Sequence, residues 1–248
     1  MTVLIDVLKD QQRSENGQRA AELSTQYEGW TAQDILRDAI RNQFFGQITL
    51  SSSFGADSAV LLHMVAQIDP NLPVIFLDTE RHFFQTLQYR DELAKRLSLT
   101  QVINLRADAD EAASEDAKGT LWRTNPDACC SLRKVRPLAR EMERYDAWIS
   151  GRKRHQSATR AGLSIVEWDG RHFKVNPLAA WTADDIAAYF QNHDLPPHPL
   201  VEQGFPSIGC FTCTKPVAAG EDARSGRWAG AEKVECGIHT PIYAGDGI

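Results

Sequence analysis

The stretch QITLSSSFGADSAVLLHMVAQ, residues 47–67, decides the fold class of this chain. Its apolar run at 48–50 is typical of a short buried strand. Small residues follow from Ser51 to Ala56, and from Asp57 apolar residues recur at helical spacing. The stretch therefore predicts a strand, a loop of small residues and a helix, in that order.

The alternation of strands and helices continues along the chain. We expect further strands at 74–77, 102–105 and 147–149, and helices at 30–43, 84–97, 132–145 and 182–192. Several of these strands are almost continuously apolar, which favours parallel pairing with helices on both faces of one sheet. We therefore expect a single α/β domain, residues 1–248, with a doubly wound, mainly parallel sheet. Its ligand should bind at the carboxyl ends of the strands, where the loops at 51–56, 78–81 and 151–160 meet.

The composition argues against several functional classes. The 248 residues include 33 acidic and 27 basic ones, and the net charge of −6 disfavours a generally basic surface for nucleic acid or membrane. Asp6, Lys9 and Asp10 interrupt the apolar N-terminus, so it does not read as a signal peptide, and no apolar run is long enough to span a membrane. We expect a cytoplasmic protein without a nucleic-acid or membrane partner.

The loop from Ser51 to Ser58 has the features of a phosphate site. Backbone N–H groups at a helix start attract anions, Gly55 permits close approach, and the hydroxyls of Ser51 and Ser53 add donors. The lysine of a Walker loop is absent. The alternative is an ordinary strand-to-helix turn, and in either case we expect Asp57 and Ser58 to cap the helix rather than to react.

The five cysteines divide into four and one. Cys129 and Cys130 are adjacent, Cys210 and Cys213 form a C-x-x-C pair, and Cys236 stands apart. Four thiolates in two pairs can hold a tetrahedral zinc or a four-iron cluster. Adjacent cysteines are unusual in a structural zinc site, so the pattern favours iron–sulfur. The alternatives are reduced core cysteines or a redox disulfide pair.

Two further features lie near these cysteines. Lys134 follows Cys130 by about one helical turn, so its ammonium could offset cluster charge and reach an anionic substrate, unless it is an ordinary surface lysine. Beyond Lys215 the chain is rich in glycine and has no periodicity. We therefore expect residues 215–248 to form an irregular, mobile C-terminal segment that carries Cys236.

Several motifs together resemble one family. CCSLRK at 129–134, GCFTC at 209–213 and ECGIH at 235–239 are similar to assimilatory adenosine 5′-phosphosulfate reductases, the iron–sulfur branch of the phosphoadenosine phosphosulfate (PAPS) reductase family. The loop at 51–58, LDT at 77–79, RHQS at 154–157 and EDARSGRW at 221–228 also resemble segments of this family. One departure is KRH at 153–155, where the family often has two arginines and an acidic residue.

This resemblance implies an adenine nucleotide alpha hydrolase-like (pyrophosphate-loop) fold and an enzyme that reduces adenosine 5′-phosphosulfate to sulfite and AMP. It implies that Cys236 is the nucleophile and that this residue carries an S-sulfonate during the reaction. It also implies that thioredoxin or a similar dithiol protein releases sulfite from that S-sulfonate. It implies that a [4Fe–4S] cluster is held by Cys129, Cys130, Cys210 and Cys213. The substrate contacts that it implies or suggests are Ser51, Ser53, Gly55, Leu77, Lys134, Arg154, Arg160, Arg224, Arg227 and His239.

Three other functions remain open at this point. The first is a reductase of the 3′-phosphorylated substrate (PAPS), which would share the loop and the ECGIH motif. The second is an ATP-dependent adenylating or thiolating enzyme that uses the same phosphate loop. The third is a zinc-ribbon-like binding module without a reactive Cys236.

Overall fold

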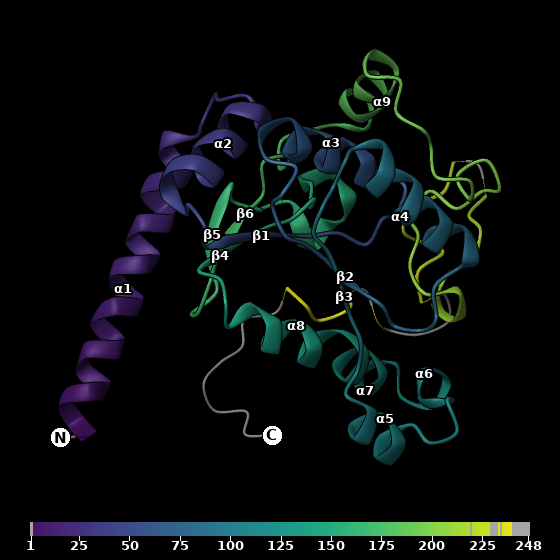
Figure 1. Ribbon diagram of the computed structural model, residues 1–248, viewed down its shortest axis with the longest axis horizontal. Coiled ribbons are helices and arrows are strands. Elements are labelled where there is room, and N and C mark those ends of the chain that lie inside the picture. Colours follow the sequence, from purple (N-terminus) through teal and green to yellow (C-terminus); the bar gives the residue numbers. More distant parts are fainter. Residues whose placement is uncertain (1, 219, 229–232, 234, 240–248) are drawn as a thin grey trace.

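The computed structural model of the chain describes residues 2–218, 220–228, 233 and 235–239. One six-stranded sheet lies between layers of helices (Figure 1). The strands are β1 (Ile48–Ser51), β2 (Val74–Leu77), β3 (Val102–Leu105), β4 (Ala147–Ile149), β5 (Val166–Trp168) and β6 (Phe173–Val175). The α-helices are α1 (Thr2–Gln26), α2 (Ala32–Asp38), α3 (Ser58–Ile68), α4 (Phe84–Arg96), α5 (Ala109–Glu115), α6 (Leu121–Thr124), α7 (Pro126–Cys130), α8 (Arg136–Met142) and α9 (Ala183–Asn192). Shorter π- and 3-10-helical turns are η1 (Ala39–Gln43), η2 (Ser131–Val135), η3 (Arg154–Gln156), η4 (Ala158–Arg160) and η5 (Phe211–Cys213).

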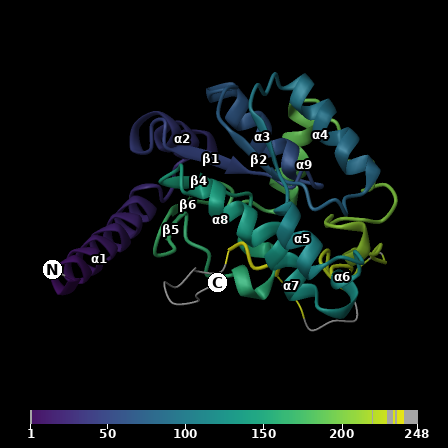
Figure 2. The ribbon, with the colours of Figure 1, turned by 60° about the horizontal axis from the view of Figure 1, so that its bottom comes forward.

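The strand order is β3-β2-β1-β4-β6-β5, and all neighbouring strands are parallel except β5 and β6. The helices α3 and α4 cover one face of the sheet and α8 covers the other (Figures 1 and 2). The chain leaves β1 toward β2 and later returns to β4 on the opposite side of β1. The carboxyl ends of β1 and β4 therefore mark the switch point of the sheet, which is where open α/β sheets commonly bind their ligands. The expected doubly wound, mainly parallel fold is confirmed.

The alternating side chains of β2 explain its continuous apolar run. Val74 and Phe76 belong to the larger hydrophobic core, whereas Ile75 and Leu77 belong to a smaller one beneath α8. Successive side chains of a strand point to opposite faces, so both faces of β2 are buried.

The expected strands at 74–77, 102–105 and 147–149 have the observed bounds. The expected helix at 132–145 is instead the π turn η2 followed by α8, which ends at Met142. The periodicity also missed α1, which is attached to the edge strand β5: Ser24 Oγ donates to the carbonyl of Val166 (2.9 Å) and accepts from its N–H (2.8 Å). In the expected C-terminal segment, residues 219, 229–232, 234 and 240–248 lie outside the described residues, and the described remainder contains no helix or strand.

Candidate active site

The loop between β1 and α3 is held by its own serines. The N–H of Phe54 donates to Ser52 Oγ (3.2 Å), and the N–H of Gly55 donates to Ser58 Oγ (2.8 Å). Phe54 has a φ of 48° and is fully buried, which fixes the loop to the core. Ser53 remains exposed at the carboxyl end of the sheet, where an anion could reach it.

Asp57 is the N-cap residue of α3, as expected, but its side chain does not form the expected cap. Its carboxylate makes no capping hydrogen bond and lies 2.9 Å from Nζ of Lys153, whose side chain is buried. Lys153 also donates to the carbonyl of Gly151 (3.2 Å). The ion pair therefore joins the loop after β1 to the loop after β4. It also satisfies a buried ammonium that would otherwise be costly.

The two cysteine pairs line one cavity. Cys129 and Cys130 lie at the end of α7, whereas Cys210 precedes η5 and Cys213 is its last residue. The cavity wall also includes Thr79, Arg81, Arg133, Lys134, Arg227 and Trp228. The spacing of the four cysteines predicts that their thiols lie together, and the fold brings them to one place. Among the described residues, no three His, Cys, Asp or Glu side chains converge closely enough to bind a single metal ion.

Local hydrogen bonds position each cysteine pair at the cavity. Asn125 Oδ1 accepts from the N–H of Ala128 (3.0 Å), and Pro126 opens α7, so this short helix begins at a defined residue and ends at the first pair. The second pair is fixed to the loop after β2. Thr79 Oγ1 lies 3.2 Å from Cys210 Sγ, within hydrogen-bonding distance.

The environment of the first pair disfavours free thiolates. Burial, together with the neighbouring thiols of Cys130 and Cys210, raises the pKa of Cys129 to about 11. Burial also raises the pKa of Cys130, although Lys134 opposes this effect. Thiolates at this place therefore need a positive charge close by.

Lys134 supplies such a charge. Burial alone would lower the pKa of Lys134, but the thiolates of Cys210, Cys236 and Cys130 outweigh burial and raise it. The neighbouring Arg133 is instead paired with carboxylates.

Arg133 was not predicted as a site residue. Its guanidinium is buried and donates to Asp116 (3.0 Å), to Glu80 (2.8 Å) and to the carbonyl of Thr79 (3.3 Å). Both Arg133 and Lys134 belong to the π turn η2, a local widening that is common at functional sites. The pair of basic residues after two cysteines is the signal that could have identified Arg133.

Three cations lie within electrostatic range of Cys236, one from η2 and two from the C-terminal segment. This half-buried thiol interacts electrostatically with Lys134, Arg224 and Arg227. Burial lowers the pKa of Arg227, and the thiols of Cys236 and Cys210 oppose that effect. A thiol beside several cations is a favourable place for an anionic substrate.

Arg227 also lies between Cys236 and the loop that follows β1. Its Nη1 donates to the carbonyl of Ile208 (3.2 Å), and that same carbonyl oxygen would lie 3.6 Å from a Cβ added to Gly55. A Cβ on Gly209 would lie 2.3 Å from Nη2 of Arg227, so only glycine leaves room for the guanidinium here. The loop after β1, the second cysteine pair and Cys236 thus meet around one arginine.

The residues on either side of Cys236 are anchored to the body. The carboxylate of Glu235 accepts from Arg160 and Arg224. The ring of His239 stacks on Trp148 with centroids 5.0 Å apart and planes 6° apart. Burial lowers the pKa of His239 well below its usual value, with nearby cations such as Arg152 adding to the effect. A neutral His239 can accept a hydrogen bond, and its Nδ1 is buried without a partner among the described residues.

Leu77 and Arg154, two of the expected substrate contacts, are not bonded to the residues around Cys236 in the part of the chain that the structure describes. Leu77 packs in the smaller core, against which Ile238 of the ECGIH motif also packs. Arg154 donates through Nε to the carbonyl of Leu163 (2.8 Å).

Lys174 was not predicted as a site residue, although a lysine inside the apolar strand β6 is an unusual pattern. Its Nζ donates to the carbonyl of His239 (3.1 Å).

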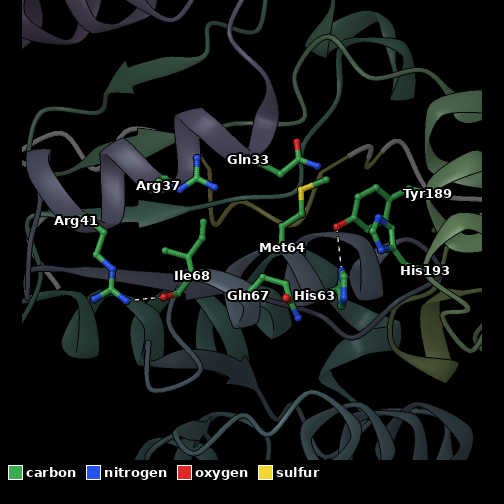
Figure 3. A pocket seen from close by; sticks show the side chains of 9 residues that line it. All are labelled: Gln33, Arg37, Arg41, His63, Met64, Gln67, Ile68, Tyr189 and His193. Carbon is green, nitrogen blue, oxygen red and sulfur yellow. Dashed lines mark hydrogen bonds between the residues drawn. The ribbon is translucent and has the colours of Figure 1, made fainter.

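A second hollow lies toward the far end of α3 (Figure 3). It is lined by residues of α2, η1, α3 and α9, including the hydrogen-bonded pair His63 and Tyr189 (2.9 Å). Arg41 on its wall donates to the carbonyl of Ile68. None of the predicted site residues lines this hollow.

The comparisons with known proteins agree with the motifs. Residues 47–216 match the model of the phosphoadenosine phosphosulfate reductase domain. An adenosine 5′-phosphosulfate reductase of Chelativorans sp. (strain BNC1) is 50% identical over 224 residues, which cover 90% of this chain and 91% of that protein. A phosphoadenosine 5′-phosphosulfate reductase of Gloeobacter violaceus is 42% identical over 243 residues, which cover 95% of this chain and 100% of that protein.

The structure was also compared with solved ones. The phosphoadenylyl-sulfate reductase of Candida auris, crystallised with phosphate, aligns with a TM-score of 0.66 and 25% identity, covering 79% of this chain and 96% of that chain. Among the described residues, no helix is both long and apolar enough to cross a membrane. By its sequence and by its fold, this chain belongs to the phosphoadenosine phosphosulfate reductase family.

Proposed function

We propose that this protein reduces adenosine 5′-phosphosulfate to sulfite and AMP, with Cys236 as the nucleophile. One observation carries the proposal: Cys236 lies among Lys134, Arg224 and Arg227, beside the cavity that holds the other four cysteines. The relative at 50% identity, which is named for this activity, supports it. The reaction would serve sulfate assimilation and cysteine biosynthesis.

The substrate would lie at the carboxyl ends of β1 and β4. Ser51, Ser53 and Gly55 would hold the 5′-phosphate, and Leu77 would lie against the adenine. Lys134, Arg224, Arg227 and His239 would contact the phosphosulfate. The motif also makes Arg154 and Arg160 candidates for substrate contact, although the guanidinium of Arg160 is bound to Glu235.

The reaction exchanges one bond to sulfur for another. The Cys236 thiolate attacks the sulfate sulfur and forms an S–S bond, while the S–O bond of the anhydride breaks. AMP leaves with the electron pair of that bond, and the neighbouring cations stabilise the charge that develops on its phosphate. Cys236 then carries an S-sulfonate.

Release of sulfite needs two electrons from a dithiol. One thiolate of thioredoxin, or of a similar dithiol protein, would attack Cys236 Sγ and expel sulfite. The second thiol would then resolve the mixed disulfide, so that the dithiol becomes oxidised and Cys236 is restored. We propose that residues 215–248 close over the nucleotide and then open toward this partner. Cytoplasmic reducing conditions would keep the thiols available.

The four cysteines of the cavity fit a [4Fe–4S] cluster. They line one cavity from two segments, and Lys134 offers a buried positive charge to thiolates that are otherwise disfavoured. A cluster offers a separate iron to each thiolate, so adjacent Cys129 and Cys130 can both be ligands. When bound, it would supply electrostatic and structural support near the substrate rather than the electrons for sulfite release.

Intact-protein mass measures the proposed chemistry. The holoenzyme is incubated anaerobically, without thiol, with adenosine 5′-phosphosulfate or its 3′-phosphorylated form, and any adduct is mapped to a peptide. We expect a sulfonate on Cys236, formed preferentially from the unphosphorylated substrate, discharged by thioredoxin and absent from Cys236→Ser.

The other outcomes discriminate between the alternatives. Preference for the 3′-phosphorylated substrate would favour the activity named for the Gloeobacter violaceus relative. No adduct from either nucleotide in protein that retains its metal would favour an ATP-dependent adenylating enzyme, which would consume ATP and release pyrophosphate.

A further inference from the structure

We infer that Glu235 positions Cys236 by forming a clasp with Arg160 and Arg224, so that Arg160 acts on the nucleophile's segment rather than on the substrate. The inference rests on the proposed role of Cys236. The Glu235 clasp denotes these three side chains below.

The geometry of the clasp is that of a bidentate ion pair. Arg160 Nε and Nη2 lie 2.9 Å from Oε1 and Oε2 of Glu235, and Arg224 Nη2 lies 3.2 Å from Oε2. The remaining Nη1 of Arg160 donates to Gln156 Oε1 (2.5 Å). Charged pairs with this fork geometry are both strong and directional. Arg160 therefore directs its whole guanidinium edge toward the segment that carries Cys236 and toward its own loop.

The side chains of the Glu235 clasp are partly buried, so the loss of one charge should be costly. The side chains of Arg160 and Arg224 are only 11% and 17% exposed, and that of Glu235 is 31% exposed. Removing one member of a partly buried ion pair leaves its partner uncompensated, which costs more than losing an exposed pair. Loss of the Glu235 charge should thus release the segment rather than leave it in place.

Cys236 lies between this clasp and a second attachment. Gly237 has a φ of 90°, a conformation that suits glycine, and it turns the chain back toward the sheet. Ile238 then packs on the smaller core, and His239 stacks on Trp148. The thiol is therefore fixed from both sides, by charge before it and by packing after it.

A competing interpretation is that Glu235 only substitutes for the substrate anion at the two arginines. In that case the substrate would displace Glu235, and removal of its charge would strengthen nucleotide binding. The clasp predicts the opposite pattern: slower reaction of Cys236 with unchanged nucleotide affinity. The two interpretations therefore separate rate from affinity.

The test uses the holoenzyme with Glu235→Gln, Arg160→Gln and the double variant. Glu115→Gln is the matched control, since Glu115 forms a similar pair with Arg136 on α5 and α8. Three quantities are measured. The first two are the single-turnover rate of Cys236 S-sulfonation at saturating adenosine 5′-phosphosulfate and the Kd for AMP. The third, which does not depend on that reaction, is the rate of Cys236 alkylation by iodoacetamide without nucleotide.

We expect Glu235→Gln and Arg160→Gln each to slow S-sulfonation about tenfold or more, because small misplacements of a reacting group are costly. The Kd for AMP should stay within about twofold, and alkylation should accelerate about threefold or more as the segment opens. The double variant should be no slower than the slower single variant, since the two residues act through each other. Glu115→Gln should match the wild type.

Several results would overturn the clasp. Tighter AMP binding with an unchanged rate in Glu235→Gln would support the substitute-anion interpretation. Additive losses in the double variant, or a raised Kd confined to Arg160→Gln, would return Arg160 to substrate contact. If the wild type forms no adduct, the proposed function fails, and unchanged alkylation in Glu235→Gln would separately reject the clasp.

Discussion

Lys134 and Arg227 lie beside the same thiol, yet their surroundings act on them in opposite directions. Burial would lower the pKa of Lys134, but the nearby thiolates raise it, so the charge of Lys134 depends on the cysteines. Burial lowers the pKa of Arg227, whose Nε has no hydrogen-bond partner within the described part of the chain. Arg227 therefore has more to gain from an anionic substrate, because a new counter-charge would offset its burial.

His198 shows how a single buried residue makes the fold depend on pH. It is fully buried, its Nδ1 accepts from the N–H of Leu200 (3.1 Å), and its Nε2 lies 3.1 Å from Thr86 Oγ1. Burial lowers its pKa from 6.5 to about 4. The unfolded chain therefore takes up a proton well before the folded protein does. Stability from this residue is complete above pH 6.5 and is lost as the pH falls toward 4.

We expect the free energy of unfolding to fall by about 2 kcal/mol between pH 7 and pH 5 through His198 alone. His198→Asn keeps an acceptor for Leu200 and removes the titration. It should be less stable than the wild type at pH 7, but its loss between the two pH values should be smaller by about that amount. Urea denaturation at each pH measures the difference. Equal pH dependence in the two proteins would show that His198 does not titrate in this way.

Among the helices and strands, the pattern of apolar residues predicts those that bury an apolar face in the core. The strands β2, β3 and β4 and the helices α3, α4 and α9 follow from periodicity, because each buries an apolar face. The hairpin of β5 and β6 was missed: its strands have only three residues each, and Lys174 interrupts the second. The helix α1 was also missed: few of its residues are apolar, and of the side chains that the structure describes in it only Ala20 and Leu23 near its end are buried in the core, beside the hydrogen bonds of Ser24.

The attachment of α1 to β5 gives a prediction for the edge of the sheet. Ser24 Oγ both donates to and accepts from the backbone of Val166, so it covers polar groups that β5 would otherwise expose. Ser24→Ala should cost about 1–3 kcal/mol of unfolding free energy, because both groups lose their partner in a partly buried place.

Thr25→Ala is the matched control, since Thr25 Oγ1 donates only to the exposed carbonyl of Ala21 within α1. It should change stability by less than about 0.5 kcal/mol. Chemical denaturation compares the two variants with the wild type. Equal losses would mean that the Ser24 contact contributes no more than an exposed helix hydrogen bond.

Across the whole molecule, the motifs predict which residues the fold brings together, but not which contacts hold them there. The cysteine pairs lie 80 residues apart in the chain and line one cavity. The roles of Arg133 and Glu235 depend on partners distant in sequence, Asp116 with Glu80 in one case and Arg160 in the other. Neither partnership has a local pattern, so neither could be read from one sequence.

The same long-range arrangement predicts how metal and activity should separate. A cluster held from both segments needs all four thiolates, so Cys129→Ser should lose iron, acid-labile sulfide and sulfite production together. Cys236→Ser should retain iron and sulfide and lose only the sulfonate adduct, because Cys236 lies outside the set of four. Metal analysis, visible absorbance and intact mass on the two variants measure this contrast. Full activity in cluster-free Cys129→Ser would reject a supporting role for the cluster, and loss of iron in Cys236→Ser would place that cysteine among its ligands.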